Sequence, residues 1–255
     1  MGVIGKIEFE TANPKKEELI VVAGSKSHIA ESFRTIRTNL SFAAPDTEKK
    51  TFIISSALPE EGKSLVSANL AVSFSQVEKK VLLVDCDLRK PRIYKIFDLE
   101  RDGGLSEFLS GSSDLRIKDT SFENLKVVTS GVIPPNPAEL LASKKMRNLL
   151  EKLREEFDMV IIDSAPILSA ADSIEVAPLT NGVVMVIKAA STPIPSVQTA
   201  IDQISDVGGK VIGCILNNVD LEKEDYYYSY YRYYHHYYYY YDKGEKKKRK
   251  KRKLV

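Results

Sequence analysis

The sequence predicts an α/β protein with a doubly wound, mainly parallel sheet and helices on both faces. Short, continuous apolar runs recur along the chain, and stretches with helical spacing separate them. A continuous apolar run is typical of a strand that is buried on both faces. Strands of this kind that alternate with helices are the pattern of a parallel sheet covered by its own connections.

The expected elements can be placed by residue number. Strands are expected at 51–55, 81–85, 125–130, 159–163, 182–189 and 210–219. Helices are expected between them, at 64–76, 137–157, 169–177 and 196–207. A further helix precedes the first strand, where apolar residues recur at the spacing of one helical face: Ile29, Phe33, Ile36 and Leu40.

These patterns divide the chain into three parts. We expect an irregular N-terminal segment at 1–25, one globular domain at 26–220 and a flexible tail at 221–255. The tail holds 12 of the 13 tyrosines and has no apolar period. Residues 243–255 carry nine Lys or Arg against one Glu, a net charge of +8. Residues 1–242 therefore have a net charge of −6, and the whole chain has +2. Such a run usually solubilises a chain, and anionic lipid or nucleic acid are its alternative partners.

Composition argues against several classes of protein. No apolar stretch approaches the roughly 18 residues of a membrane span, and no signal peptide begins the chain, so we expect a cytoplasmic protein with at most peripheral membrane contact. Cys86 and Cys214 lie in apolar runs without metal-ligand spacing, which indicates buried thiols. His28, His235 and His236 lack a Ser, Cys or metal pattern around them, so hydrolase chemistry has no support.

A phosphate-binding loop is predicted where the strand at 51–55 meets the next helix. The stretch SSALPEEGKSLVSANLA contains Gly62-Lys63-Ser64, which match the end of the pattern G-x-x-x-x-G-K-[ST]. Ala57 replaces the first glycine of that pattern. Backbone N–H groups at a helix start bind phosphate oxygens, the lysine neutralises their charge, and the serine hydroxyl ligates Mg²⁺. The nucleotide is expected to contact the following residues: Pro59, Glu60, Glu61, Gly62, Lys63, Ser64 and Leu65.

Carboxylates follow two further predicted strands. Asp85 and Asp87 end the stretch VLLVDCD, and Asp163 ends MVIID. Ligands of open parallel sheets bind at the carboxyl ends of the strands, so these residues should meet the phosphate loop. Mg²⁺ takes few carboxylates together with water and phosphate oxygens. ATP and Mg²⁺ are therefore the expected cofactors, with Ser64, Asp87 and Asp163 as candidate metal ligands. By analogy with this fold, the adenine is expected near Asn217 and Asn218.

As a set, the motifs resemble the bacterial tyrosine kinases that regulate capsule and exopolysaccharide synthesis, which have a P-loop NTPase fold. The resemblance covers about Ser25 to Asn218 and the tail, and it follows the separate kinase chain of Gram-positive bacteria. It rests on the phosphate loop, the DxD-x-R strand end with Arg89, the MVIIDSAP strand, SKSHIAESFRTIRTNLSF, SGVIPPNPAELL and the tyrosine cluster.

The resemblance implies a protein-tyrosine kinase that phosphorylates its own tail in a neighbouring copy. Lys63 would hold the phosphates, and Asp85, with Asp87 beside it, would orient or deprotonate the tyrosine hydroxyl, whose ordinary pKa is near 10. Several phosphates, each adding about −1.5 to −2, would offset the basic run. The acceptors would be Tyr226, Tyr227, Tyr228, Tyr230, Tyr231, Tyr233, Tyr234, Tyr237, Tyr238, Tyr239, Tyr240 and Tyr241.

The resemblance also implies partners. Glu31, Arg34 and Arg37 recur every three residues, which from spacing alone is an exposed, salt-bridged helix face; in the family this motif lies at the subunit interface of a ring. A transmembrane activator and a phosphotyrosine phosphatase are implied as well, and nucleic acid is not. Residues 1–20 match nothing in the family pattern and are either a divergent N-terminus or a grafted activator segment.

Two other functions remain open from the sequence. The partitioning and cell-division-positioning ATPases share the fold, but their loop carries a further lysine close after its first glycine. Leu58 stands there in this chain, and together with the tail it favours the kinase. A non-catalytic, ATP-dependent scaffold is the other alternative.

Overall fold

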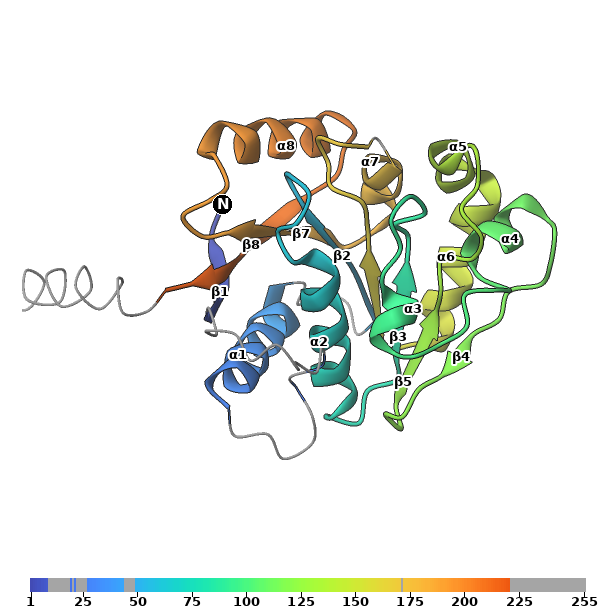
Figure 1. Ribbon diagram of the computed structural model, residues 1–255, viewed down its shortest axis with the longest axis horizontal. Coiled ribbons are helices and arrows are strands. Elements are labelled where there is room, and N and C mark those ends of the chain that lie inside the picture. The colour runs from blue at the N-terminus through green and yellow to red at the C-terminus, as the bar shows by residue number, and fades with distance from the viewer. Residues whose placement is uncertain (9–18, 20, 22–26, 44–48, 171, 221–255) are drawn as a thin grey trace, which may run out of the picture. The chain divides into compact units, whose positions relative to one another are not determined.

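Eight strands form one sheet in the computed structural model, which describes residues 1–8, 19, 21, 27–43, 49–170 and 172–220 (Figure 1). The strand order is β1-β8-β7-β2-β6-β3-β5-β4, and every neighbouring pair is parallel except β4 and β5. The bounds are β1 (Val3–Glu8), β2 (Lys50–Ser56), β3 (Val81–Asp85), β4 (Lys118–Asp119), β5 (Leu125–Val128), β6 (Met159–Asp163), β7 (Gly182–Lys188) and β8 (Val211–Val219). The predicted fold class is confirmed.

Helices cover both faces of this sheet, and each face has its own apolar core. Successive side chains of a strand point to opposite faces, so Phe52 and Ile54 of β2 join one core while Ile53 joins the other. The first core is covered by α1 (His28–Ala43), α2 (Lys63–Ser75) and α3 (Ile93–Ile96). The second is covered by α4 (Leu105–Ser110), α5 (Pro137–Ala142), α6 (Lys144–Glu156), α7 (Asp172–Val176), the 3-10 helix η1 (Ala177–Leu179) and α8 (Ile194–Asp206).

The N-terminal segment corrects one prediction. Residues 1–25 were expected to be irregular, but Val3–Glu8 form β1, an edge strand that pairs in parallel with β8. Within β1 only Ile7 is fully buried. The local sequence therefore lacks the continuous apolar run that marks the central strands, and pairing with a distant strand creates β1. Met1–Val219 form one compact unit, so β1 belongs to the domain that was expected to begin at residue 26.

Three short elements, α3, α4 and β4, were not expected because none is long enough to show a period. Local contacts fix α4: the carboxylate of Glu107 accepts the backbone N–H groups of Gly103 at 3.2 Å and Gly104 at 3.1 Å. The helix ends at Gly111, whose φ of 81° is a left-handed conformation that favours glycine.

The predicted tail and all of its candidate acceptor tyrosines lie outside the described residues. In the described stretches no helix is both long and apolar enough to cross a bilayer. Cys86 and Cys214 are buried free thiols, as predicted.

The helix expected at 137–157 is two helices, divided at Ser143. Pro137 occupies the first turn of α5, as predicted. Ser143 then adopts an extended backbone, with φ −66° and ψ 152°, and its Oγ accepts the N–H of Met146 at 3.2 Å. A serine with this geometry is an N-cap, which satisfies a backbone donor at the start of α6. Apolar spacing continues across the break, so the spacing alone does not show it.

We therefore expect Ser143→Ala to lower the free energy of unfolding by about 1 kcal/mol, since it removes the cap acceptor. Ser143→Asp keeps an acceptor and should retain most of the stability, and Ser143→Gly should lose only a few tenths of a kcal/mol. Chemical denaturation of the three variants measures the differences. Equal loss in the alanine and aspartate variants would contradict the capping role.

Candidate functional site

The phosphate loop joins β2 to α2, and its conformation depends on glycine at one position. Gly62 is the N-cap of α2 with φ 92°, and Glu60 also has a positive φ of 63°. A Cβ on residue 62 would collide with the side-chain amide of Asn217 at the end of β8. The loop therefore places the start of α2, with its unpaired backbone N–H groups, at the carboxyl edge of the sheet, as the sequence predicted.

Glu61 supports this loop from inside. Its side chain is 3% exposed, and its carboxylate accepts the N–H groups of Leu58 at 2.8 Å and Lys188 at 3.4 Å together with the hydroxyl of Thr192. Asn217 donates from Nδ2 to the Glu61 carbonyl at 2.9 Å. The Glu61 side chain thus joins the loop to the end of β7, and the Glu61 carbonyl joins it to Asn217 of β8. A contact of Glu61 with the nucleotide stays a prediction. Thr192 was missed by sequence reasoning because nothing local marks it.

Lys63 contacts the acidic residues directly. Its Nζ lies 2.7 Å from Asp87 Oδ2 and 3.3 Å from Ser64 Oγ. Burial by itself would lower the pKa of Lys63, but the charges of Asp163, Asp87 and Asp85 outweigh it and raise that pKa above its usual value. Lys63 is therefore a fixed positive charge among carboxylates.

Asp85 and Asp163 lie side by side because β3 and β6 are parallel and in register, with the two residues paired at the strand ends. Both are fully buried. Burial, followed by the charges of Asp163 and Asp87, raises the pKa of Asp85 well above its usual range. Burial also raises the pKa of Asp163, and the charge of Lys63 and the Ser64 and Ser67 hydroxyls act against that rise.

The two carboxylate oxygens of Asp163 differ in their contacts. Ser67 donates to Oδ1 at 3.0 Å, whereas Oδ2, also buried, accepts no hydrogen bond within the described part of the chain. A buried carboxylate oxygen without a partner is costly, and a cation or a water bound to one would satisfy it. Ser67 was missed by sequence reasoning, although it follows Lys63 by one helical turn.

The donor set fits Mg²⁺. Among the described residues no three carboxylate, imidazole or thiol side chains form a preformed metal cage. Mg²⁺ does not need one, because it keeps several waters and takes phosphate oxygens with one or two carboxylates. The 6%-exposed Ser64 and the carboxylates of Asp87 and Asp163 supply such a set.

Asp85 has a different environment from Asp87. Its Oδ1 accepts the N–H of Asp87 at 3.2 Å and its Oδ2 that of Ile93 at 3.3 Å. Asp87 accepts Lys63 at Oδ2 and the N–H of Lys90 at Oδ1, the latter at 3.0 Å. Both oxygens of Asp85 therefore face its own loop in this state.

The other predicted nucleotide contacts lie around the same edge. Pro59 and Glu60 are exposed on the loop, and Leu65 is exposed on the first turn of α2. Asn218, the penultimate residue of β8, has a left-handed conformation with φ 62°, which asparagine tolerates. Asn217 contacts the phosphate loop, but a role of Asn218 toward adenine stays a prediction.

The predicted interface residues on α1 separate into two groups. Arg34 pairs with Glu31 at 2.7 Å on the surface. Arg37 instead donates to the Ser73 carbonyl of α2 at 2.7 Å, and burial followed by the nearby Arg34 charge lowers its pKa. Arg37 thus fastens α1 to α2 within one chain. The ring interface itself stays a prediction.

Comparison with known proteins identifies the family of this chain. The family model described as "AAA domain" matches residues 60–211. The tyrosine-protein kinase YwqD of Bacillus subtilis is 41% identical over 214 residues, which cover 83% of this chain and 90% of that protein. The tyrosine-protein kinase ptk of Acinetobacter johnsonii is 36% identical over 83% of this chain but 29% of its own length, so the matching region is part of a longer protein there.

Solved structures separate the two candidate families. A crystal structure of the chimerical protein CapA2B2 superposes with a TM-score of 0.79 at 37% identity, over 86% of this chain and 95% of that one. The septum site-determining protein MinD of Pyrococcus horikoshii superposes with a TM-score of 0.57 at 22% identity over 66% of this chain and 70% of that one, which is a likeness of fold alone. The chain belongs to the bacterial tyrosine-protein kinases, built on a P-loop domain of the AAA type.

Proposed function

We propose that this chain transfers the γ-phosphoryl group of Mg²⁺-bound ATP to tyrosines in the tail of a second copy, and that this reaction regulates capsule or exopolysaccharide synthesis. One observation carries the proposal: Lys63, Asp87 and Asp163 meet at the start of α2, where the buried Oδ2 of Asp163 has no hydrogen-bond partner among the described residues. Phosphoryl transfer depends on such positioning and charge neutralisation more than on covalent chemistry.

Lys63 and the loop amides would hold the phosphates. Because Lys63 contacts Asp87 in this structure, its ammonium group would turn to the β- and γ-phosphate oxygens when nucleotide binds, which frees Asp87 Oδ2. Asp163 Oδ2, Asp87 and the Ser64 hydroxyl would hold Mg²⁺, which supplies neutralisation of the developing charge.

Asp85 is the proposed acceptor of the tyrosine proton. The phenol O–H would give its proton to a carboxylate oxygen of Asp85 as the phenol oxygen forms its bond to phosphorus and the bond to the ADP oxygen breaks. Asp85 can accept this proton only in its ionised form, and a pKa raised by burial makes that carboxylate a stronger base toward the phenol. Asp85 is fully buried, with both oxygens engaged by its loop, so its segment would have to open toward the acceptor.

The assembly around this reaction extends the proposal. A segment with many adjacent tyrosines and no aliphatic residues can enter a neighbouring site in extended form. The surface pair of Glu31 and Arg34 on α1 would contribute to a ring of copies. A transmembrane activator would hold the chain at the inner face of the membrane, and a phosphotyrosine phosphatase would reset the tail.

Lys63→Met should lower the rate of tail phosphorylation by at least about 100-fold, because it removes the charge that neutralises the phosphates. Lys152→Met, an exposed lysine of α6, is the matched control and should retain activity. Phosphate incorporation into the full chain with ATP and Mg²⁺, located by mass spectrometry, measures both. Activity in the Lys63 variant, or no phosphotyrosine between 226 and 241 in the unaltered chain, contradicts the proposal.

Transfer between copies is tested by mixing. The Lys63→Met chain with its tail is incubated with an otherwise unaltered chain that ends at residue 220. Phosphotyrosine should appear on the inactive chain in proportion to the concentration of the truncated one. A truncated chain that is active on a free tyrosine peptide but leaves the inactive chain unmodified would show transfer within one copy instead.

Asp85 should give the nucleotide-free protein a characteristic pH dependence. Because its pKa is raised in the folded state, the folded protein holds a proton that the unfolded chain loses near pH 4, and stability falls as pH rises toward the folded pKa. Asp85→Asn should remove this fall, so its stability relative to the unaltered protein should increase with pH, by at most about 1.4 kcal/mol per pH unit. Urea denaturation between pH 4 and 8 measures it, with Asp206→Asn on the surface of α8 as control. A pH-independent difference would contradict the raised pKa.

A further inference from the structure

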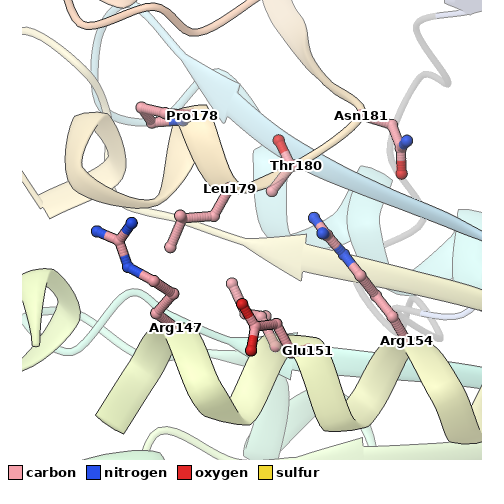
Figure 2. A pocket seen from close by; sticks show the side chains of 8 residues that line it. Arg147, Glu151, Arg154, Pro178, Leu179, Thr180 and Asn181 are labelled. Atoms are coloured by element: carbon pink, nitrogen blue, oxygen red, sulfur yellow. The ribbon is translucent and has the colours of Figure 1, made fainter. Parts of the chain in front are cut away.

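A small cavity lies between α6 and the segment that leads from η1 into β7 (Figure 2). Its volume is about 230 Å³. It is lined by Arg147, Leu150, Glu151, Arg154, Pro178, Leu179, Thr180 and Asn181. Asn181 directly precedes β7, and its Oδ1 accepts the N–H of Thr51 near the start of β2 at 2.7 Å. Because these strands are parallel, the cavity lies at the edge of the sheet opposite the phosphate loop.

Two arginines reach into this cavity from one helix. Arg147, Glu151 and Arg154 are spaced i, i+4 and i+7, so they share one face of α6. Figure 2 shows both guanidinium groups extending from the helix toward the opposite wall. Among the described residues, no hydrogen bond or ion pair holds the Arg147 guanidinium.

Arg154 is held more firmly than Arg147. Its Nε donates to Thr51 Oγ1 at 3.2 Å, which fixes the direction of the guanidinium plane. Burial lowers its pKa, and the charge of Glu151 acts against that shift. Arginine remains charged in proteins, so a partly buried positive group faces the cavity with its terminal N–H donors available for a ligand.

The lining has far more donors than acceptors. Each guanidinium carries five N–H donors and no acceptor, and Glu151 is the one anionic side chain in the lining. Two positive charges and one negative charge leave an excess of +1. The wall opposite the helix includes the apolar side chains of Pro178 and Leu179, beside the polar Thr180 and Asn181.

We propose that this cavity binds a small organic anion, which places one carboxylate or phosphate head between Arg147 and Arg154 and a flat apolar body against Pro178 and Leu179. Guanidinium forks match both head groups with paired hydrogen bonds. The volume suits such a ligand, since an apolar cavity of roughly 150 Å³ already holds benzene. The site shares no residue with the nucleotide site, so it stands or fails independently of the kinase proposal.

Glu151 gives the site a selectivity that can be tested. It places a negative charge between the two arginines, and like charges repel more strongly as the charge of the ligand increases. Removal of the Glu151 charge should therefore strengthen binding of a singly charged carboxylate, and of a doubly charged phosphate more.

Ligand-observed NMR tests the proposal on the full chain with ADP and Mg²⁺ in excess, so that the phosphate loop is occupied. The probes are benzoate, phenyl phosphate and inorganic phosphate. Arg147→Gln should weaken binding of benzoate at least fivefold. Lys152→Gln makes the same charge change on the exposed surface of α6, outside the lining, and should leave it within twofold. Glu151→Gln should tighten benzoate about threefold and phenyl phosphate more.

The results separate the outcomes. The tighter of benzoate and phenyl phosphate identifies the head group. Equal binding of phenyl phosphate and inorganic phosphate overturns the proposal, because the apolar wall would then contribute nothing. Equal effects of the Arg147 and Lys152 substitutions also overturn it, since binding would follow net charge alone. Arg147 is exposed, so its substitution should leave the melting temperature unchanged, and Glu151→Gln provides a second test with the opposite sign.

Discussion

The enclosure of like charges at one sheet edge is the constraint on which the rest of this structure depends. The register of β3 and β6 sets Asp85 directly beside Asp163, both without solvent contact, and Asp87 follows two residues later. Lys63 lies among them, with its ammonium group 2.7 Å from Asp87. Buried charges are stable only when opposite charges and hydrogen bonds compensate them, and one ammonium group does not balance three carboxylates. The cluster of carboxylates is thus prepared for added positive charge.

Much of the surrounding architecture keeps that cluster in place. Glu61 holds the phosphate loop against the ends of neighbouring strands, and Ser67 orients Asp163 from the second turn of α2. Arg37 fastens α1 to the C-terminal part of α2, at Ser73. The contact of Arg37 therefore gives α1 a structural role within one chain, separate from the role that is proposed for α1 in a ring. A substitution of Arg37 would disturb the packing of α2 as well as any ring contact.

The sequence was informative where a residue's environment follows from its neighbours along the chain. Central strands are buried on both faces and are continuous apolar runs, so β2, β3, β6 and β7 could be placed, and with them the carboxylates at their ends. Features that depend on distant partners could not be placed. The edge strand β1 exists because β8 lies beside it, and the Glu61 carboxylate is buried because Thr192 and Lys188 come to it. The cavity at Arg147 needs α6 and η1 together, so no local pattern marks it.

The side-chain amide of Asn217 has a consequence for anyone who shortens this protein. It donates to the carbonyl of Glu61 and occupies the space beside Gly62. The end of β8 therefore acts as a latch that holds the phosphate loop through this hydrogen bond, although more than 150 residues separate the two in the chain. Truncations that stop beyond Val219 preserve this latch, while those that remove the end of β8 would release the loop and mimic a damaged active site.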